Sequence, residues 1–363
     1  MDPSFDIIEV RIPFLSPFTT SFGTEKERDA LILRFSSGGV TALAECVTDE
    51  GPYYSYEDNH TAMHIIKDLL ANSVRDAPTP SEFMRRVERI RGHNMAKASV
   101  EMMLWDYHCK KGRKSMAEAL GPTKGHAEVG ISIGMDKPEA MAKRVGAAIE
   151  RGYRRIKVKI EKGKEHEILR AVRDEYPEVS LSADANSDYR YSDLPLLKRI
   201  DRFGLVYLEQ PLEHDDLIDH VRLAKEISTP ICLDESISTV DSARQAFEIG
   251  AAKVINIKPG RLGGFNNSLE VARIARENGG HVWVGGMLET GIGRAFNVAF
   301  ASIKLIDYPG DTSPNDRYFA RDIVKNPFNM ENGRIRPNDG PGIGVELDSR
   351  AFRKYAVKRT KAF

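Results

Sequence analysis

The sequence predicts an α/β protein: a modified TIM barrel of the (β/α)7β type, with an N-terminal α+β capping domain that the C-terminal tail completes. Seven short apolar stretches alternate with amphipathic helical patterns from about residue 125 onward, an order typical of a parallel sheet whose strands are joined by helices. Charged residues recur at the ends of five of these stretches at intervals of 25, 25, 25 and 24 residues, the length of one β/α unit. The chain of 363 residues is also long for a single hydrophobic core, which indicates an additional domain.

The first 122 residues are predicted to form the capping domain, with strands first and helices after them. Alternating β-branched residues in "FDIIEVRIPF" and "DALILRFSSGGVTALAECV" favour an antiparallel meander broken at Gly38-Gly39, and the polar stretch "SPFTTSFGTEKE" between them is predicted to be a loop. Helical patterns follow over residues 56–74, 81–92 and 94–112. The last is expected to begin with Asn94 as a capping residue and to end at Gly112.

Residues 123–320 are predicted to form the barrel, and residues 321–363, rich in Pro, Gly and Asn, to return to the cap. An eighth strand is expected near "KLIDYPGD" (304–311), where the strand pattern is weakest. The seven predicted strands lie within residues 127–134, 154–160, 179–186, 205–212, 230–236, 253–260 and 281–287. The predicted helices between them lie within residues 138–152, 165–177, 192–204, 217–228, 239–251 and 266–280.

Composition excludes several classes of function. Lys plus Arg and Asp plus Glu number 53 each, so the chain has no net charge that would favour a nucleic acid partner. The N-terminus lacks the pattern of a signal peptide, and no stretch is long and apolar enough to predict a membrane span. Three cysteines without metal-ligand spacing are expected to be reduced and buried: Cys46, Cys109 and Cys232. We therefore expect a cytoplasmic protein with no nucleic acid or membrane partner.

The periodic charged residues are the strongest functional signal in the sequence. In "YRRIKVKI", Ile156 and Val158 alternate with Lys157 and Lys159, so the two lysines share one face of a strand. One β/α unit separates each member of the series from the next, and this spacing places all five at the C-terminal rim of the barrel, where such barrels carry their active sites. In chain order, the series is Lys159, Asp184, Glu209, Asp234 and Lys258.

Three converging carboxylates would repel one another and resist ionisation unless a cation lies between them. Oxygen ligands alone favour Mg²⁺, with Mn²⁺ as an alternative, over Zn²⁺. A bound divalent cation would stabilise the charge that develops when a substrate carboxylate loses its α-proton. A partly desolvated lysine beside the cation would have a depressed pKa and would serve as the base. The sequence therefore predicts Lys159 and Lys258 as catalytic residues, flanking a metal site.

Each of these residues has an ordinary explanation when considered alone. Lysines alternating on a strand are usually a solvated face, and an acidic residue after a strand often caps the next helix. Glu209 could simply pair with Lys159 or Lys258. The fixed period of all five argues for a site, because a buried network of ion pairs is costly to assemble without a function.

Further residues are candidates for substrate binding, each with an alternative. Lys157 either contacts a substrate carboxylate or pairs with Glu209, and Asn186 is either a ligand contact or a turn residue. Ser132 ends the first barrel strand and is either a contact or an ordinary barrel serine. Backbone N–H groups of "VGGMLETGIG", including Gly286 and Met287, either bind a carboxylate or form a tight turn. Glu235 is a candidate neighbour of the metal ligands, and none of the nine histidines is assigned to metal.

Taken together, these residues resemble the enolase superfamily, in its muconate-lactonising subgroup. The strand-end motifs "KVK", "DAN", "EQP", "DES" and "NIKPGRLGG" carry this resemblance, and "GGMLETGIGRA" with "PGDTSPNDRY" is similar to the branch of o-succinylbenzoate synthases and N-succinylamino-acid racemases. The resemblance covers nearly the whole chain, with "PFTTSFGT" as a mobile capping loop. The sequence departs from the family pattern at two places. Gly121-Pro122 stands where the family commonly has Gly-Gly after the cap helices, and "TALAEC" stands where its cap strand usually has "GxGE". Both places lie outside the rim and concern the packing of the cap.

The resemblance implies Mg²⁺ bound by Asp184, Glu209 and Asp234, with Lys159 and Lys258 on opposite faces of a small-molecule carboxylate. It implies a synthase of menaquinone biosynthesis, in which Lys159 removes the α-proton and then protonates the departing hydroxyl while Lys258 remains a cation. The alternatives are an N-succinylamino-acid racemase and then a dipeptide epimerase, although the Asp-x-Asp pair expected of an epimerase near the eighth strand is absent. From other classes, a Schiff-base aldolase or a barrel that only binds a ligand stay open. We expect a homo-oligomer.

Overall fold

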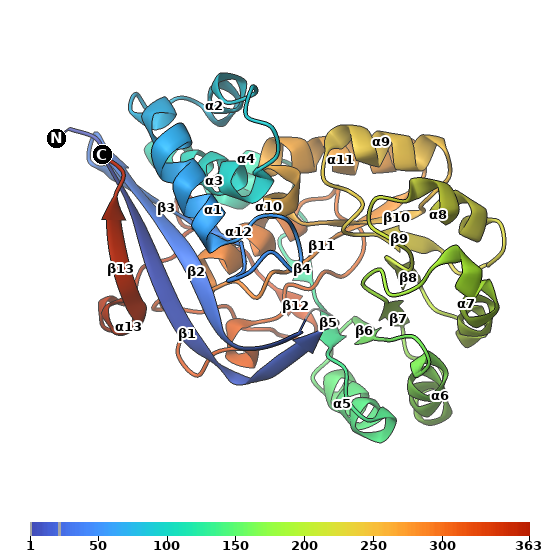
Figure 1. Cartoon of the computed structure of the whole chain (residues 1–363). Coiled ribbons are helices and arrows are strands. Elements are labelled where there is room, and N and C mark those ends of the chain that lie inside the picture. The colour runs from blue at the N-terminus through green and yellow to red at the C-terminus, as the bar shows by residue number, and fades with distance from the viewer. Residues whose placement is uncertain (1, 21–22) are drawn as a thin grey trace.

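The computed structural model describes residues 2–20 and 23–363. The cap sheet lies beside the barrel, and the two described ends of the chain lie close together at the edge of the cap (Figure 1). The described residues contain no helix with the length and apolarity that a membrane crossing requires. The three cysteines are free and buried, as predicted.

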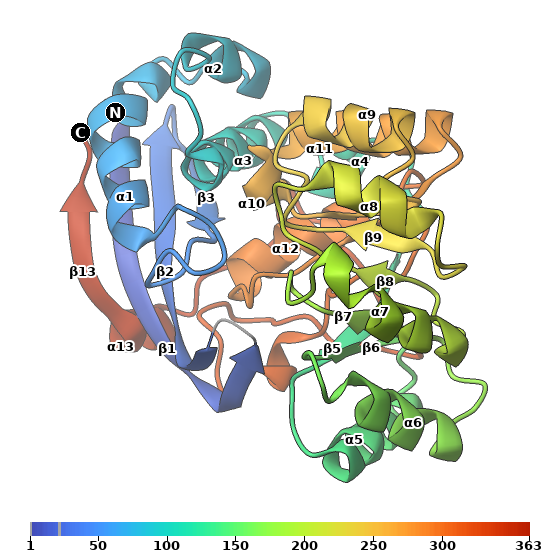
Figure 2. The ribbon, with the colours of Figure 1, turned by 45° about the vertical axis from the view of Figure 1, so that its right-hand side comes forward.

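The cap sheet is an antiparallel meander completed by the end of the chain. Its strand order is β13-β1-β2-β3, and Gly38 and Gly39 form the β2–β3 turn with φ of 55° and 80°, a conformation that glycine adopts without strain. The tail returns to the cap as predicted, because β13 pairs with β1 from Asp6↔Lys361 onward (Figure 2). The strands are β1 (Ser4–Thr20), β2 (Gly23–Ser37), β3 (Val40–Cys46) and β13 (Ala356–Lys361), the last preceded by α13 (Ser349–Tyr355).

The predicted loop over residues 16–27 is instead a hairpin arm. Strands β1 and β2 resume pairing at Phe18↔Glu25 and continue to Thr20↔Gly23, and the Thr19 and Thr24 hydroxyls share a hydrogen bond of 2.9 Å. Paired threonines favour a strand, which explains why the loop prediction was wrong there. Ser21 and Phe22 of the expected capping loop lie outside the described residues.

The cap helices pack between the sheet and the barrel. Helix α3 contacts both β3 and the short barrel helix α10 (Pro259–Leu262). The prediction of Asn94 as its cap is wrong: His93 is the N-cap residue with φ 50°, and the Glu57 carboxylate accepts hydrogen bonds from the backbone N–H groups of Met95 and Ala96. Gly112 ends the helix as predicted. The helices are α1 (Asn59–His64), which continues as single turns to Val74, α2 (Pro80–Arg86), α3 (Asn94–Lys111) and α4 (Met116–Leu120).

All seven predicted barrel strands form one parallel sheet, with order β11-β10-β9-β8-β7-β6-β5. Helices cover its outer face (Figure 2). The strands are β5 (Gly130–Ile133), β6 (Arg155–Lys159), β7 (Leu181–Asp184), β8 (Leu208–Glu209), β9 (Ile231–Leu233), β10 (Val254–Ile257) and β11 (His281–Val284). The predicted helices are α5 (Pro138–Glu150), α6 (Glu165–Glu175), α7 (Leu194–Ile200), α8 (Leu217–Ala224), α9 (Val240–Glu248) and α11 (Phe265–Glu277). Two further helices, α10 (Pro259–Leu262) and α12 (Gly291–Ala301), were not predicted. A separate pair is formed by β4 (Ala127–Glu128) and β12 (Arg334–Ile335).

The eighth strand predicted within 304–311 is an irregular segment at the expected position. The backbone N–H groups of Tyr308 and Asp311 donate to Val282 and Val284 of β11, at 3.1 and 2.9 Å. On its other side, Gly310 accepts from the N–H of Gly130 at 2.7 Å, so the segment bridges β11 and β5. A regular strand does not form because Pro309 has no N–H to donate to a ladder. The domain boundaries at 122 and 320 stay a prediction.

Candidate active site

The parallel register brings the periodic charged residues together. Lys159 pairs with Asp184 across β6 and β7, and Asp184 pairs with Glu209 across β7 and β8. Asp234 and Lys258 each follow the end of their strand by one residue. The three carboxylates are at most 1% exposed. The sequence period of one β/α unit therefore corresponds to neighbouring positions on one rim.

Each lysine of the series donates to a carboxylate. Lys159 Nζ lies 2.6 Å from Asp184 Oδ2 and 2.5 Å from Asn186 Oδ1. Lys258 Nζ lies 2.9 Å from Asp234 Oδ2. The two lysines thus approach the acidic trio from different strands, with Glu209 between them.

Lys157 and Asn186 both have partners in this network. Lys157 Nζ lies 2.7 Å from Glu209 Oε2 and 3.1 Å from Asp184 Oδ2, so the pairing alternative for this lysine holds in the structure. Asn186 adopts φ 43° just after β7, as a turn residue does, and its amide also donates to Glu235 Oε1 at 2.9 Å. Glu235 is therefore a neighbour of the rim, reached through Asn186.

A cavity of about 740 Å³ opens above this network, between the rim and the cap. The hairpin arm and residues 49–54 form its cap side, including Tyr54, whose hydroxyl donates to Asp234 Oδ1 at 3.2 Å. Ser132 Oγ is buried and has no hydrogen-bond partner among the described residues, and Ser132 lines the cavity. Eight of the predicted site residues line the cavity: Ser132, Lys157, Lys159, Asp184, Asn186, Lys258, Gly286 and Met287. Glu209 and Asp234 lie behind them, paired with lysine and arginine side chains.

The carboxylates differ in their affinity for protons. Burial opposes ionisation of Asp184, but Lys159 and Lys157 outweigh it and hold the pKa of Asp184 at about 2. Burial and the nearby charge of Asp184 raise the pKa of Glu209 to about 8. The crowding of the acidic trio therefore opposes ionisation of Glu209 when no cation lies among the three carboxylates.

The expected depressed lysine pKa is not found at Lys258. Burial lowers the pKa of Lys258, but the Asp234 carboxylate 2.9 Å away raises it further, so the pKa lies above its ordinary value. The expectation assumed a cation that would share the charge of Asp234, whereas here that charge is shared by Lys258 and Arg261.

Sequence reasoning missed further residues of this network, among them Tyr54, Arg261, Asn256 and Asp311. The Arg261 guanidinium contacts Asp234 and donates to the Tyr54 hydroxyl at 2.9 Å. Asn256 donates to Glu209 Oε1 at 2.9 Å, and Asp311 Oδ2 lies 3.0 Å from Lys157 Nζ. Asn256 precedes Lys258 by two residues on β10, so strand alternation could have indicated it. Arg261 and Asp311 belong to the motifs "NIKPGRLGG" and "PGDTSPNDRY", but strand alternation indicates neither of them.

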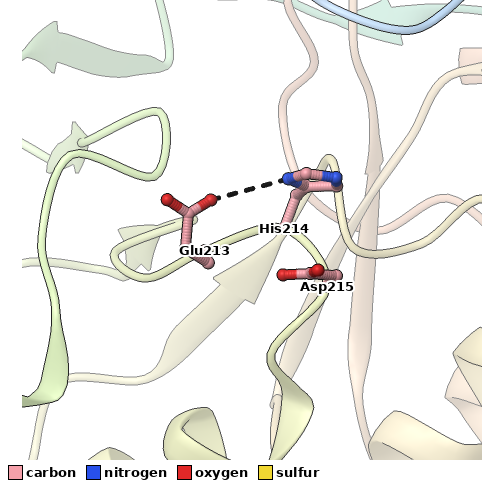
Figure 3. Close-up of side chains that lie close together, drawn as sticks. All are labelled: Glu213, His214 and Asp215. Carbon is pink, nitrogen blue, oxygen red and sulfur yellow. Dashed lines mark ion pairs between the residues drawn. The ribbon is translucent and has the colours of Figure 1, made fainter.

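The acidic trio fits a hard divalent cation in its chemistry: three buried carboxylates, with oxygen as the ligand atom throughout. Lysine, arginine and asparagine side chains hold these oxygens in the structure. Among described His, Cys, Asp and Glu residues, the trio whose ligand atoms lie within 4.8 Å of one another is instead Glu213, His214 and Asp215 (Figure 3). Glu213 also pairs with Arg190, and two of the three residues are exposed. We do not assign a metal to that loop.

Comparison with known proteins agrees with the geometry. Residues 140–351 match the family described as enolase C-terminal domain-like, and residues 4–121 match the N-terminal domain of mandelate racemase and muconate lactonizing enzyme. The chain belongs to the enolase superfamily. Within this superfamily it is 42% identical to o-succinylbenzoate synthase of Bacillus subtilis, over 94% of this chain and 93% of that protein. It is 41% identical to N-succinylamino acid racemase of Thermus thermophilus, over 93% and 92% of the two chains.

A solved enolase-superfamily structure from Listeria innocua covers 99% of this chain and 98% of its own, with a TM-score of 0.95 and 37% identity. The predicted superfamily, and the branch of synthases and racemases within it, are confirmed by these relatives.

Proposed function

We propose that this superfamily member is an o-succinylbenzoate synthase, a magnesium-dependent hydro-lyase of menaquinone biosynthesis. The observation that carries the proposal is the placement of Lys159 and Lys258 around three buried carboxylates beneath a cavity between the rim and the cap. Relatives named o-succinylbenzoate synthase, 38–42% identical over most of the chain, support the choice of reaction.

Charge balance at the cavity floor supports an anionic substrate. When its five carboxylates are all ionised, they balance the five cationic side chains beside them. A divalent cation would then leave two excess positive charges, which a substrate carboxylate and the loss of one lysine proton would balance. The net charge of these residues therefore favours a carboxylate substrate and a neutral lysine base when a divalent cation is bound. The residues counted are Asp184, Glu209, Asp234, Glu235 and Asp311 against Arg155, Lys157, Lys159, Lys258 and Arg261.

Asp184, Glu209 and Asp234 would hold Mg²⁺, with Mn²⁺ as an alternative. The bound cation would stabilise the negative charge on a substrate carboxylate after α-proton loss. Lys159, freed from Asp184, takes the α-proton and returns it to the departing hydroxyl on the same face, so that a proton and hydroxide leave together as water. Lys258 stays a cation on the other face. We assign substrate contacts to Ser132, Lys157, Asn186, Gly286 and Met287, which line the same cavity.

The second candidate is racemisation of N-succinylamino acids. The presence of a lysine from each side of the rim favours it, because two-faced proton exchange at one carbon needs a base and an acid on opposite faces. Relatives named N-succinylamino acid racemase are 41% identical to this chain. A dipeptide epimerase is a weaker alternative.

One set of assays separates these reactions. Purified protein with Mg²⁺ is given the cyclohexadiene precursor of o-succinylbenzoate, and N-succinylamino acids in deuterium oxide. Synthase activity removes water from the precursor, and racemase activity introduces deuterium at Cα. Lys159→Ala and Lys258→Ala should each lower turnover by at least about 100-fold. Lys124→Ala is the matched control, because Lys124 is half-buried and donates to Ile306 O at 2.7 Å, away from the cavity.

Failure of the wild-type enzyme on both substrate classes would refute the proposal. Borohydride trapping of a carbonyl substrate on lysine would indicate a Schiff-base enzyme instead. Ligand binding that Lys159→Ala leaves unchanged, with no turnover by wild type, would indicate a binding protein.

We further propose a cytoplasmic location and a homo-oligomeric state. The three free, buried cysteines suit a reducing compartment. Exposed apolar side chains such as Ile218 and Val357, 68% and 59% exposed, offer surface for a subunit contact. Light scattering on the purified protein tests the oligomeric state, and a monomer at all concentrations would refute it.

A further inference from the structure

Asp311 is an ionisable group at the cavity that the proposed reaction does not use. It lies in the irregular segment between β11 and β5, and its side chain is 13% exposed. Its Oδ2 lies 3.0 Å from Lys157 Nζ, and its Oδ1 lies 3.0 Å from Arg155 Nη2. The backbone is fixed as well, because the Asp311 N–H donates to Val284 and the Asp311 carbonyl accepts from Arg294 at 3.0 Å. This carboxylate is therefore held in place independently of the acidic trio.

Lys157 has three carboxylate partners for its three ammonium protons. They are Glu209 at 2.7 Å, Asp311 at 3.0 Å and Asp184 at 3.1 Å. The ammonium also lies 4.7 Å from the centre of the Trp283 ring, which limits where it can move. Two of the three partners belong to the proposed metal ligands, and Asp311 does not.

A divalent cation and an ammonium group compete for the same carboxylates. Cation binding at Glu209 and Asp184 would weaken their attraction for Lys157 and repel its ammonium group. Asp311 faces Lys157 as a remaining anion, and Arg155 balances part of its charge. Burial raises the pKa of Asp311, but Lys157 and Arg155 outweigh it and lower that pKa, so this partner stays ionised.

We propose that Asp311 is a positioning residue, which holds the Lys157 ammonium at the cavity wall when Glu209 and Asp184 bind a divalent cation. Two consequences follow. Cation binding becomes easier, because the displaced ammonium keeps a partner. Lys157 also stays beside the cavity, where it can contact the carboxylate of the substrate. The inference rests on the metal site and reaction proposed above.

Asp311→Asn tests the proposal with the magnesium ion alone as the probe. The amide keeps the size of the side chain and removes its charge. Isothermal titration of the folded variant should show Mg²⁺ affinity weakened on the order of tenfold, the size expected for losing a charged hydrogen bond. Asp322→Asn is the matched control, because Asp322 is also buried but accepts hydrogen bonds from the Gly291 N–H, away from any lysine of the site. The control should bind Mg²⁺ as wild type does.

A double-mutant cycle shows whether the effect passes through Lys157. In a Lys157→Met background, Asp311→Asn should have no further effect on Mg²⁺ affinity. With saturating Mg²⁺, Asp311→Asn alone should weaken binding of o-succinylbenzoate on the order of tenfold and raise KM more than it lowers kcat. Asp311→Ser, which also removes the charge, replaces the asparagine variant if that variant fails to fold.

The outcomes are distinct. Unchanged Mg²⁺ affinity in Asp311→Asn, or an equal loss in the Lys157→Met background, would overturn the positioning role and leave the proposed function intact. Wild type that binds no Mg²⁺ would overturn the metal site and this inference together. Wild type that binds Mg²⁺ but not o-succinylbenzoate would contradict the proposed reaction, while the magnesium titrations would still decide the role of Asp311.

Discussion

Magnesium binding by this enzyme should be coupled to the release of a proton from Glu209. The pKa of Glu209 is raised to about 8 by burial and by the charge of Asp184, whereas a carboxylate must be ionised to bind a cation. Below pH 8, the apparent affinity should therefore fall by up to about tenfold for each pH unit. Between pH 8 and pH 6 the expected loss is roughly 50-fold.

Isothermal titration at pH 6, 7 and 8 measures this dependence. At pH 7, the binding enthalpy measured in two buffers of different ionisation enthalpy should indicate release of close to one proton. Glu235→Gln is the control, because burial and Asp234 raise the pKa of Glu235 to about 7 and it could release a proton as well. This variant should keep the dependence between pH 7 and pH 8. Equal affinities at pH 6 and pH 8 would refute the reasoning, and loss of the whole dependence in Glu235→Gln would refute the assignment to Glu209.

Three further predictions concern stability, packing and thiol reactivity. The Glu101 carboxylate accepts hydrogen bonds from the N–H groups at the start of α11, and burial raises its pKa to about 7. Its contribution to the stability of the fold is therefore complete below pH 4.5 and is lost as the pH rises through 7. Relative to Glu101→Gln, wild type should lose roughly 3 kcal/mol between pH 4.5 and pH 8 in urea unfolding, and a constant difference would contradict this. In Gly285→Ala, the new Cβ would lie 2.2 Å from Asn256 Oδ1 and 2.8 Å from Lys258 Cγ. We therefore expect kcat to fall at least about tenfold and the free energy of unfolding to fall by about 1–3 kcal/mol. An unchanged kcat would show that Lys258 is not displaced. A thiol reagent such as dithionitrobenzoate should label none of the cysteines in the native protein and all in denaturant, since they are buried, and rapid native labelling would contradict the burial of Cys46, Cys109 and Cys232.

The barrel strands could be predicted because each depends on a short pattern of neighbouring residues. Each barrel strand reads as a short apolar stretch bounded by helical patterns, and all seven formed where expected. The prediction failed at the eighth strand and at the polar stretch between β1 and β2. Pro309 prevents a regular eighth strand, although backbone hydrogen bonds keep its segment in the ring. Pairing between β1 and β2 converted a polar stretch that looked like a loop into a hairpin arm.

Helix starts show the same limit. Asn94 has the side chain of a capping residue. The N–H groups of Met95 and Ala96 at the start of α3 nevertheless donate to the carboxylate of Glu57, which lies 38 positions before Met95. Since a distant carboxylate can replace a local cap, the sequence around a helix start does not determine which side chain satisfies it.

The sequence alone determined the lysines and carboxylates of the rim. A repeat of one β/α unit fixes their height, and strand alternation fixes the side of the sheet they face; both are properties of the local chain. Only the tertiary structure brought Tyr54 within 2.9 Å of Arg261, 207 residues later, and Asp311 within 3.0 Å of Lys157. These contacts depend on how the cap packs on the barrel and how the irregular segment closes the ring. No local pattern encodes them, because they join segments that become neighbours only in the folded chain.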